Sequence, residues 1–315
     1  MEQQLGLPIH EVFDIIGGSS SAGGLLAALV GGLHQPAEEA VDIWRRAASM
    51  FFSSGKNTGN MSARGYVHPD ANMERALSNF MSAEDFERND WPSDKPKVFL
   101  ATTRILKPLG RVEYLCRNYE VLHHDAEKSG TCKLSLKDAC RATAAAPSYF
   151  PKQKIMIDGK LHYFEDGALL TSNPSKVAIL EALKAFPGAV LGCLVSIGTG
   201  RLPIGGLSQE NVQLLEEESL EVCSRTEDTD GDLRSCLQLA SGGDLLQELH
   251  YYRLQFDLPK VAMFDNVKEI SLLQNLAKQT IQEQPVMRIE TGSRENGPPL
   301  ASADCLLYKS LFPRA

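Results

Sequence analysis

A run of small residues, Phe13–Gly24, holds the serines that could act as a nucleophile. It reads Phe-Asp-Ile-Ile-Gly-Gly-Ser-Ser-Ser-Ala-Gly-Gly and leads from an apolar stretch typical of a buried strand into a stretch typical of a helix. A serine at such a strand–turn–helix corner sits on a strained turn among small neighbours, and helix N–H groups point at the oxyanion that forms during acyl transfer. The pattern therefore predicts a nucleophile elbow.

Two other glycine-rich turns could have this composition. A phosphate-binding loop needs a lysine after its last glycine, but Leu25 and Leu26 stand there. A dinucleotide-binding turn fails as well, because the glycine spacing differs and no acidic residue follows about twenty residues later at the end of a strand. A plain structural turn remains the alternative to the elbow.

A second motif supplies a carboxylate. Phe164-Glu-Asp-Gly-Ala168 follows a short apolar strand and precedes the helix start at Asn173-Pro174. An Asp-Gly pair after a strand is often only a turn. Together with the elbow, however, Asp166 completes a Ser/Asp dyad, in which a partly desolvated carboxylate orients and deprotonates the serine hydroxyl.

The sequence offers no pattern for a metal site. Its seven histidines include no HExxH motif, and its seven cysteines form neither a CxxC pair nor a zinc-type spacing with histidine. Asp228, Asp230 and Asp232 resemble the start of a calcium loop, but its sixth and twelfth positions hold Leu233 and Leu239. We therefore expect neither a metal nor an organic cofactor.

Strands and helices alternate along the part of the chain that must position these groups. The expected strands are Val12–Gly17, Lys97–Ile105, Val112–Tyr119, Ile155–Ile157, Leu161–Phe164 and Ala189–Ile197. The expected helices are Leu25–Leu33, Pro36–Phe52, Ser135–Ala146 and Asn173–Phe186. This alternation predicts an α/β fold with a mainly parallel sheet covered on both faces.

The last third of the chain has a different character. Residues 209–248 hold eleven acidic residues and two arginines, so most of the net charge of −8 belongs to this segment. We expect two helices there, separated by a solvated loop at Thr226–Asp232. A strand at Tyr251–Leu258 and a closing helix at Lys268–Gln284 follow, and an irregular tail is expected over 285–315.

The composition limits the class of protein. The 315 residues are 43% hydrophobic and 23% charged, as in ordinary globular proteins. The acidic balance argues against a nucleic-acid binder, and no apolar run reaches the ~18–20 residues of a membrane span. Because the cysteines are scattered and the N-terminus lacks the pattern of a secretory signal, we expect an intracellular, cytoplasmic protein.

Five motifs in a fixed order resemble those of patatin-like phospholipases. They are the elbow, the block Ala142–Phe150, the Asp166-Gly-Ala motif, Asn173-Pro174 and Val195–Gly200. The similarity spans about residues 8–284. Arg117-Asn-Tyr119 and the spacing throughout look most like the gamma-type branch of the calcium-independent phospholipases A2.

This resemblance implies a fold and a site. Patatin-like enzymes are three-layer α/β sandwiches that hydrolyse lipid acyl esters with a Ser/Asp dyad, without a catalytic histidine or a metal. Asp166 takes the position of the family's base, and Gly167 and Ala168 complete its motif. The family's serine lies in a Gly-x-Ser-x-Gly pattern, whereas this chain carries one extra residue between Gly18 and Gly23.

The extra residue leaves two candidates for the nucleophile. Counting from Phe13 selects Ser20, flanked by Gly18 and Ala22, and counting back from the helix selects Ser21. We favour Ser21, because the distance from serine to helix sets the oxyanion donors, whereas an added strand residue can be absorbed as a bulge. The residues expected to shape the elbow and oxyanion site are Gly18, Ser19, Ala22, Gly23 and Gly24.

One part of the family pattern has no counterpart in this sequence. The family carries a glycine-rich oxyanion loop after its first strand, well upstream of the serine. Here nineteen or twenty residues precede the serine, and Gly6 is their one glycine before Gly17. We therefore expect a patatin-like domain over 1–284 that is N-terminally incomplete, without the first strand and this loop. The loss of one oxyanion donor typically lowers the rate by ~10²–10³.

The resemblance implies a phospholipase A-type lipid acyl hydrolase that forms an acyl-enzyme and works at a phospholipid or membrane surface. Two alternatives remain open. The chain could be a catalytically impaired lipid-binding or regulatory relative, as the missing loop and the irregular elbow would allow. It could also be a soluble esterase or thioesterase with smaller acyl substrates.

Overall fold

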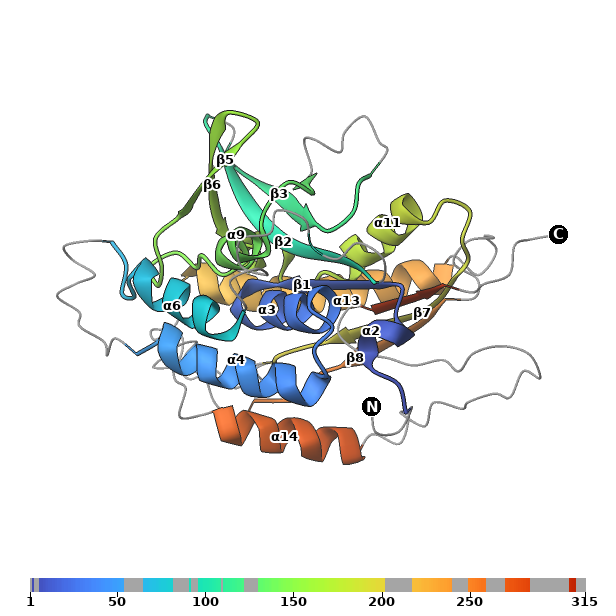
Figure 1. The fold of residues 1–315 in the computed structure, drawn as a ribbon. Coiled ribbons are helices and arrows are strands. Elements are labelled where there is room, and N and C mark those ends of the chain that lie inside the picture. Colours follow the sequence, from blue (N-terminus) through green and yellow to red (C-terminus); the bar gives the residue numbers. More distant parts are fainter. Residues whose placement is uncertain are drawn as a thin grey trace.

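The computed structural model describes residues 2, 6–53, 65–81, 91, 96–108, 110–121, 130–201, 217–239, 249–258, 270–283 and 306–309. Within these residues a central sheet runs through the molecule, with helices on both of its faces (Figure 1). The strands are β1 Ile15–Ser19, β2 Lys97–Leu106, β3 Gly110–Arg117, β4 Gly130–Thr131, β5 Gln153–Ile157, β6 Lys160–Asp166, β7 Leu191–Ile197, β8 His250–Leu254 and β9 Leu306–Lys309.

The sheet is mixed, so the expectation of a mainly parallel sheet is wrong. Its strand order is β4-β3-β2-β1-β9-β7-β8, and the hairpin β5–β6 joins it through pairing of β6 with β2. The pairs β1–β2, β3–β4 and β7–β8 are parallel. Short connections reverse the chain between β2 and β3 and between β5 and β6, and β9 runs antiparallel to both of its neighbours.

The turn of the β5–β6 hairpin follows from its sequence. Ile157 pairs with Lys160, so Asp158 and Gly159 form a two-residue loop. Both residues have positive φ, at 50° and 75°. This is the backbone that an Asp-Gly pair favours in a tight hairpin, because its twist matches that of the flanking strands.

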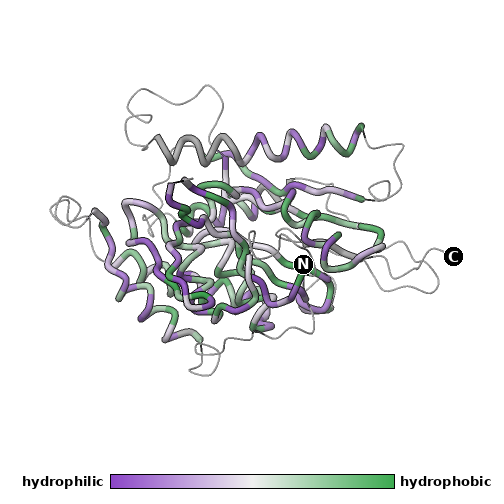
Figure 2. The backbone as a smooth tube through the Cα atoms, turned by 90° about the horizontal axis from the view of Figure 1, so that it is seen from above, coloured by the Kyte–Doolittle hydropathy of each residue, from purple (hydrophilic) through white to green (hydrophobic). Residues whose placement is uncertain are grey.

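The helices form the outer two layers. They are α2 Ile9–Val12, α3 Leu25–Ala27, α4 Ala37–Phe51, α6 Asp70–Phe80, α9 Leu136–Thr143, α10 Ala168–Thr171, α11 Ser175–Ala185, α13 Glu217–Leu239 and α14 Ile270–Glu283, with π-helical turns η1 Ser20–Gly24 and η2 Ala28–Gly32 flanking α3. Hydrophilic and hydrophobic residues alternate along the outer helices (Figure 2), as expected when one face of each packs inward.

Two apolar clusters fill the space between the layers. The first joins the β1 residue Ile16 and the β2 residue Leu100 to residues of α3, α4 and α9. The second joins the neighbouring residues Ile15 and Ala101 to α11 and α13. Since successive side chains of a strand point to opposite faces, these clusters lie on the two sides of one sheet. The expected three-layer α/β sandwich is confirmed.

Helix α13 corrects a second expectation. The predicted solvated loop at Thr226–Asp232 is instead part of one continuous helix, Glu217–Leu239. Two acidic residues of this stretch bond to other elements, because Asp230 accepts from the Tyr251 hydroxyl and Asp232 accepts from Lys176. These contacts with other elements favour the helix over the loop that the local composition indicates.

The C-terminal segment also differs from the expected irregular tail. Leu306–Lys309 forms β9 and lies between β1 and β7. The run Leu-Leu-Tyr-Lys has apolar and aromatic residues suited to a strand inside a sheet, and pairing on both sides satisfies its backbone. The expectation is therefore wrong for these four residues, and the rest of the tail lies outside the described residues.

Candidate active site

The elbow begins where β1 ends. β1 pairs in register with β2 through Ser19 and Ala101, and Ser20 follows at a positive φ of 64°. Positive φ is uncommon for a residue other than glycine, and such strain clusters at functional sites. Ser20 is half-buried and opens the π-helical turn η1, so its side chain stands at the corner between strand and helix.

The Ser20 hydroxyl donates a hydrogen bond of 2.7 Å to Oδ2 of Asp166. Asp166 is the last residue of β6, and its other carboxylate oxygen accepts the Ala168 N–H at 2.8 Å. Its backbone is fixed too, since its N–H donates to the Ala145 carbonyl and its carbonyl accepts from the Thr103 hydroxyl. The carboxylate is therefore held in one orientation toward the serine.

Asp166 is only 4% exposed. Burial raises the pKa of this carboxyl to about 7, against the opposing effect of the hydrogen bonds from Ala168 and Ser20. A carboxylate with a pKa near neutrality is matched to accepting a proton from a hydroxyl at neutral pH.

Thr143 holds the elbow from behind. Its hydroxyl accepts the Ser20 N–H at 2.9 Å and donates to the Ala101 carbonyl at 2.5 Å. It also restricts the elbow glycine Gly24, where an added Cβ would lie 2.5 Å from Cγ2 of Thr143. Thr143 belongs to the block Ala142–Phe150, but nothing in the local sequence pairs it with Ser20.

The structure resolves which serine meets the aspartate, and it differs from the preference for Ser21. Ser20 makes the bond to Asp166, while the Ser21 carbonyl accepts a hydrogen bond from Trp44 Nε1 at 3.0 Å. The preference assumed a bulge in the strand, but β1 pairs with β2 without any register shift. The extra residue is accommodated after the serine instead, in the wider π-helical turn η1.

Glycines allow the close approach of the segments around the dyad. A Cβ on Gly18 would lie 2.0 Å from the Gly23 carbonyl oxygen. A Cβ on Gly167 would lie 2.0 Å from the Ala101 carbonyl oxygen and 2.8 Å from the Ser19 hydroxyl oxygen. At Gly23 the nearest atom would be 3.8 Å away, an ordinary contact. The elbow thus depends on Gly18 and Gly167 sterically, and much less on Gly23.

This difference gives a matched pair of variants. We expect Gly18→Ala to destabilise the fold by about 1–3 kcal/mol, because the new methyl group overlaps a backbone carbonyl that cannot rotate away. Gly23→Ala, in the same elbow, should change the free energy of unfolding by less than about 1 kcal/mol. Urea denaturation of both variants measures the difference, and equal effects at the two sites would contradict the packing described here.

The other motif residues lie away from the dyad bond. Asn173 organises the start of α11, where its Oδ1 accepts from Ser175 and from the Ser196 hydroxyl. Arg117 and Tyr119 both bond to the buried carboxylate of Glu181. We therefore assign these motifs to packing.

The described residues contain no group of three or more histidine, cysteine, aspartate or glutamate side chains that could hold a metal ion. The described helices include none that is both long enough and apolar enough to cross a membrane.

Fold and site together define a class of protein: a three-layer α/β protein with a serine on a strained elbow, bonded to a buried carboxylate. The family model for patatin-like phospholipases matches residues 3–179 of the chain. This match covers more than half of the 315 residues, and the chain belongs to the patatin-like phospholipase family.

The chain is also similar in sequence to individual phospholipases. The chain is 33% identical over 199 residues to the calcium-independent phospholipase A2-gamma of Oryctolagus cuniculus, covering 62% of this chain and 24% of the relative. The Homo sapiens protein of that name is 32% identical, with 62% and 25% covered. Phospholipase A I of Arabidopsis thaliana is 26% identical over 256 residues, with 64% and 19% covered. The chain thus spans about a quarter or less of the length of these relatives.

Proposed function

We propose that the protein hydrolyses fatty-acyl esters of glycerophospholipids as a phospholipase A, with Ser20 as nucleophile and Asp166 as general base. The observation that carries this proposal is the 2.7 Å hydrogen bond from the Ser20 hydroxyl to a buried carboxylate with a pKa of about 7. The family and the names of the relatives support the substrate class.

In the first half of the reaction, Ser20 Oγ attacks the ester carbonyl while its proton moves to Asp166 Oδ2. The tetrahedral intermediate then collapses, the ester bond breaks, and the leaving lysophospholipid oxygen takes the proton back from Asp166. The product is an acyl-enzyme on Ser20. The orientation of Asp166 by the Ala168 N–H keeps one carboxylate oxygen directed at the serine throughout.

In the second half, water attacks the acyl-enzyme. Asp166 takes a proton from the water, and the collapse of the second tetrahedral intermediate releases the fatty acid and returns the proton to Ser20. We assign oxyanion stabilisation to the N–H groups of Ser21 and Ala22, the second and third residues of η1. The Ser20 N–H takes no part in it, because it is already bonded to Thr143.

Fatty-acid release from phospholipid vesicles, measured with a metal chelator present, tests this function. We expect release by the wild-type chain, since no step of the proposed mechanism passes through a metal. Asp166→Asn should reduce it to background. Turnover of a water-soluble short-chain ester without vesicle hydrolysis would favour the esterase alternative. A folded wild-type protein that hydrolyses neither substrate would favour the catalytically impaired alternative.

A further inference from the structure

The sheet continues beyond the edge at which the elbow lies. β2 pairs with β1 over Lys97–Ala101, and its second half extends further, where it pairs with β3 and β6. The hairpin β5–β6 completes this extension, which rises above the helical layers in Figure 1 with α9 at its base. Because the carboxyl end of β1 carries Ser20, the extension rises from the same edge as the dyad.

The side chains on the two faces of the hairpin differ in their exposure to solvent. On one face α9 packs against both strands. The side chains of Ile155, Ile157 and Phe164 are buried on this face. On the other face Met156 is 61% exposed, Leu161 49% and Tyr163 36%. Met156 pairs directly with Leu161, and Tyr163 follows two residues later on the same face.

An apolar outward face is unusual for an antiparallel hairpin, where polar residues normally point to water. Three large apolar side chains next to one another form a patch of the kind that marks a docking surface. The patch lies close to the dyad along the strand, because Tyr163 precedes Asp166 by three residues, about 10 Å, with the two side chains on opposite faces of the sheet.

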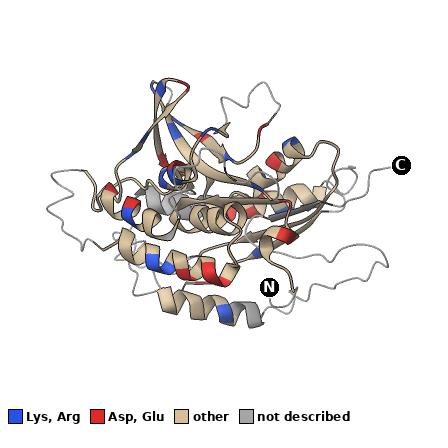
Figure 3. Ribbon diagram, viewed as in Figure 1, with Lys and Arg blue, Asp and Glu red and all other residues tan. Residues whose placement is uncertain are grey.

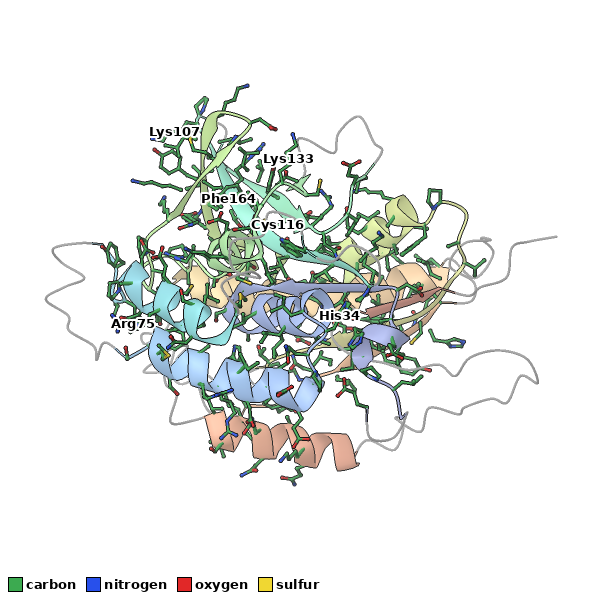
Figure 4. All side chains as sticks on the ribbon, in the orientation of Figure 1. His34, Arg75, Lys107, Cys116, Lys133 and Phe164 are labelled. Atoms are coloured by element: carbon green, nitrogen blue, oxygen red, sulfur yellow. The ribbon has the colours of Figure 1, made fainter. Side chains whose placement is uncertain are left out.

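Lysines surround the patch. Lys154 pairs with Tyr163 and shares the face of the patch, whereas Lys160 pairs with Ile157 and lies at the hairpin turn on the opposite face. Both lysines are exposed, as is Lys107, which follows β2. None of the three forms an ion pair with another described residue. Figure 3 shows the basic residues along this extension, and Figure 4 shows Lys107 at its far end.

The carboxylates of the hairpin are already paired. Asp158 bonds to Lys133 at 2.8 Å, and Glu165 to Arg111 at 2.6 Å and Lys152 at 2.8 Å. The extension therefore presents unpaired positive charge in a chain whose net charge is −8. Such a local reversal of sign complements an anionic surface and not a neutral one.

We propose that the outward face of the β5–β6 hairpin docks on a phospholipid bilayer that carries anionic headgroups. Met156, Leu161 and Tyr163 enter the interface, and Lys154 meets the headgroups beside them, while Lys160 at the hairpin turn and Lys107 after β2 reach headgroups at the rim. Docking there brings the edge that carries Ser20 to the lipid. This inference rests on the proposed function for its purpose, but the binding can be measured without any turnover.

Co-sedimentation of a Ser20→Ala chain with vesicles tests the docking surface. Vesicles of phosphatidylcholine and phosphatidylserine should bind this chain, and pure phosphatidylcholine should bind it more weakly. Met156→Asp with Leu161→Asp should weaken binding by about tenfold or more, because two charges replace the apolar contact. The matched control is Leu180→Asp on α11, whose parent residue is 55% exposed and lies outside the patch.

A second pair of variants tests the charge. Lys154→Glu with Lys160→Glu should remove the preference for phosphatidylserine, and Lys278→Glu on α14 should not. Binding by both hairpin variants at the wild-type level, with circular dichroism unchanged, would overturn the proposal. The proposal would also be overturned if Leu180→Asp and Lys278→Glu lost as much vesicle binding and phosphatidylserine preference as the corresponding hairpin variants.

The outcomes separate docking from catalysis. If binding depends on the hairpin but the wild-type chain hydrolyses no phospholipid, the docking surface stands and the proposed function fails. If the hairpin variants hydrolyse vesicles and bind them as the wild-type chain does, the proposed function stands and the docking surface is wrong.

Discussion

Replacing Ser20 by alanine is expected to remove ester hydrolysis, by a factor on the order of 10⁴–10⁶. The Ser20 hydroxyl is the one that donates a hydrogen bond to Asp166, at 2.7 Å. The neighbouring Ser21→Ala should retain activity within about tenfold, because Ser21 contributes its backbone to the site and not a bond from its side chain to Asp166. Initial rates on a short-chain ester measure both variants.

The two serines are adjacent and have similar exposure, so the pair controls for local damage to the elbow. Thermal unfolding should show that both variants remain folded, although only Ser20→Ala removes a side-chain hydrogen bond, the one to Asp166. Loss of activity in Ser21→Ala with activity retained in Ser20→Ala would show that the serine was assigned wrongly.

Asp166→Asn is expected to lower the rate of hydrolysis by about 10²–10⁴ and to remove its pH dependence near neutrality. Burial raises the pKa of Asp166 to about 7, and only the deprotonated carboxylate can act as base. For the wild-type chain, kcat/KM should therefore rise with pH up to about 7 and then level off. A rate profile between about pH 5 and about pH 9 measures this inflection. A wild-type profile that is flat across this range would contradict the assignment of Asp166.

The same raised pKa makes a prediction about stability. Between the unfolded-state pKa of about 3.9 and the folded-state value near 7, the unfolded chain loses a proton that the folded chain retains. The contribution of Asp166 to stability is therefore full below about pH 4 and is lost as pH rises through about 7. Asparagine keeps the shape without this charge, so Asp166→Asn should melt above the wild-type chain at about pH 8, and the difference should shrink toward about pH 4. A variant that melts below the wild type at both pH values would contradict this account.

Several local features could be predicted from short stretches of sequence. The Asp158-Gly159 turn has the residues that its positive φ values require. The capping serine at the start of α9, Ser135, accepts the Asp138 N–H as its spacing indicates. β2 is one residue longer than expected at its C-terminal end, and α4 is one residue shorter than expected at each end. In each case the information lies within a few neighbouring residues.

The features that could not be predicted depend on contacts between distant segments. The position of the extra elbow residue is decided by Thr143 and by the tight contact between Gly18 and Gly23, which permit a π-helical turn after Ser20. The continuity of α13 depends on Tyr251 and Lys176 from other elements. The place of β9 between β1 and β7 involves residues almost 300 positions apart. The secondary-structure propensity of a short stretch carries no information about these contacts between distant segments.

The candidate site also has features that local sequence predicts and features that depend on contacts between distant segments. The position of Asp166 at the end of a strand facing the elbow could be predicted from its motif, because the motif and the strand that presents it are contiguous. Which of the two serines forms the hydrogen bond to Asp166 could not be predicted, because it depends on where the backbone turns. The raised pKa of Asp166 could only be stated as a requirement of the chemistry until its burial beneath neighbouring segments was known.

Covalent labelling by a fluorophosphonate probe, with the adduct mapped by tandem mass spectrometry, tests the central claim most directly. This reagent reacts with an activated serine hydroxyl, so it reports the nucleophile and its base without any assumption about the lipid substrate. We predict one adduct, on Ser20, that disappears in Asp166→Asn although the variant remains folded. An adduct on Ser21, or none on a folded wild-type chain, would contradict the account.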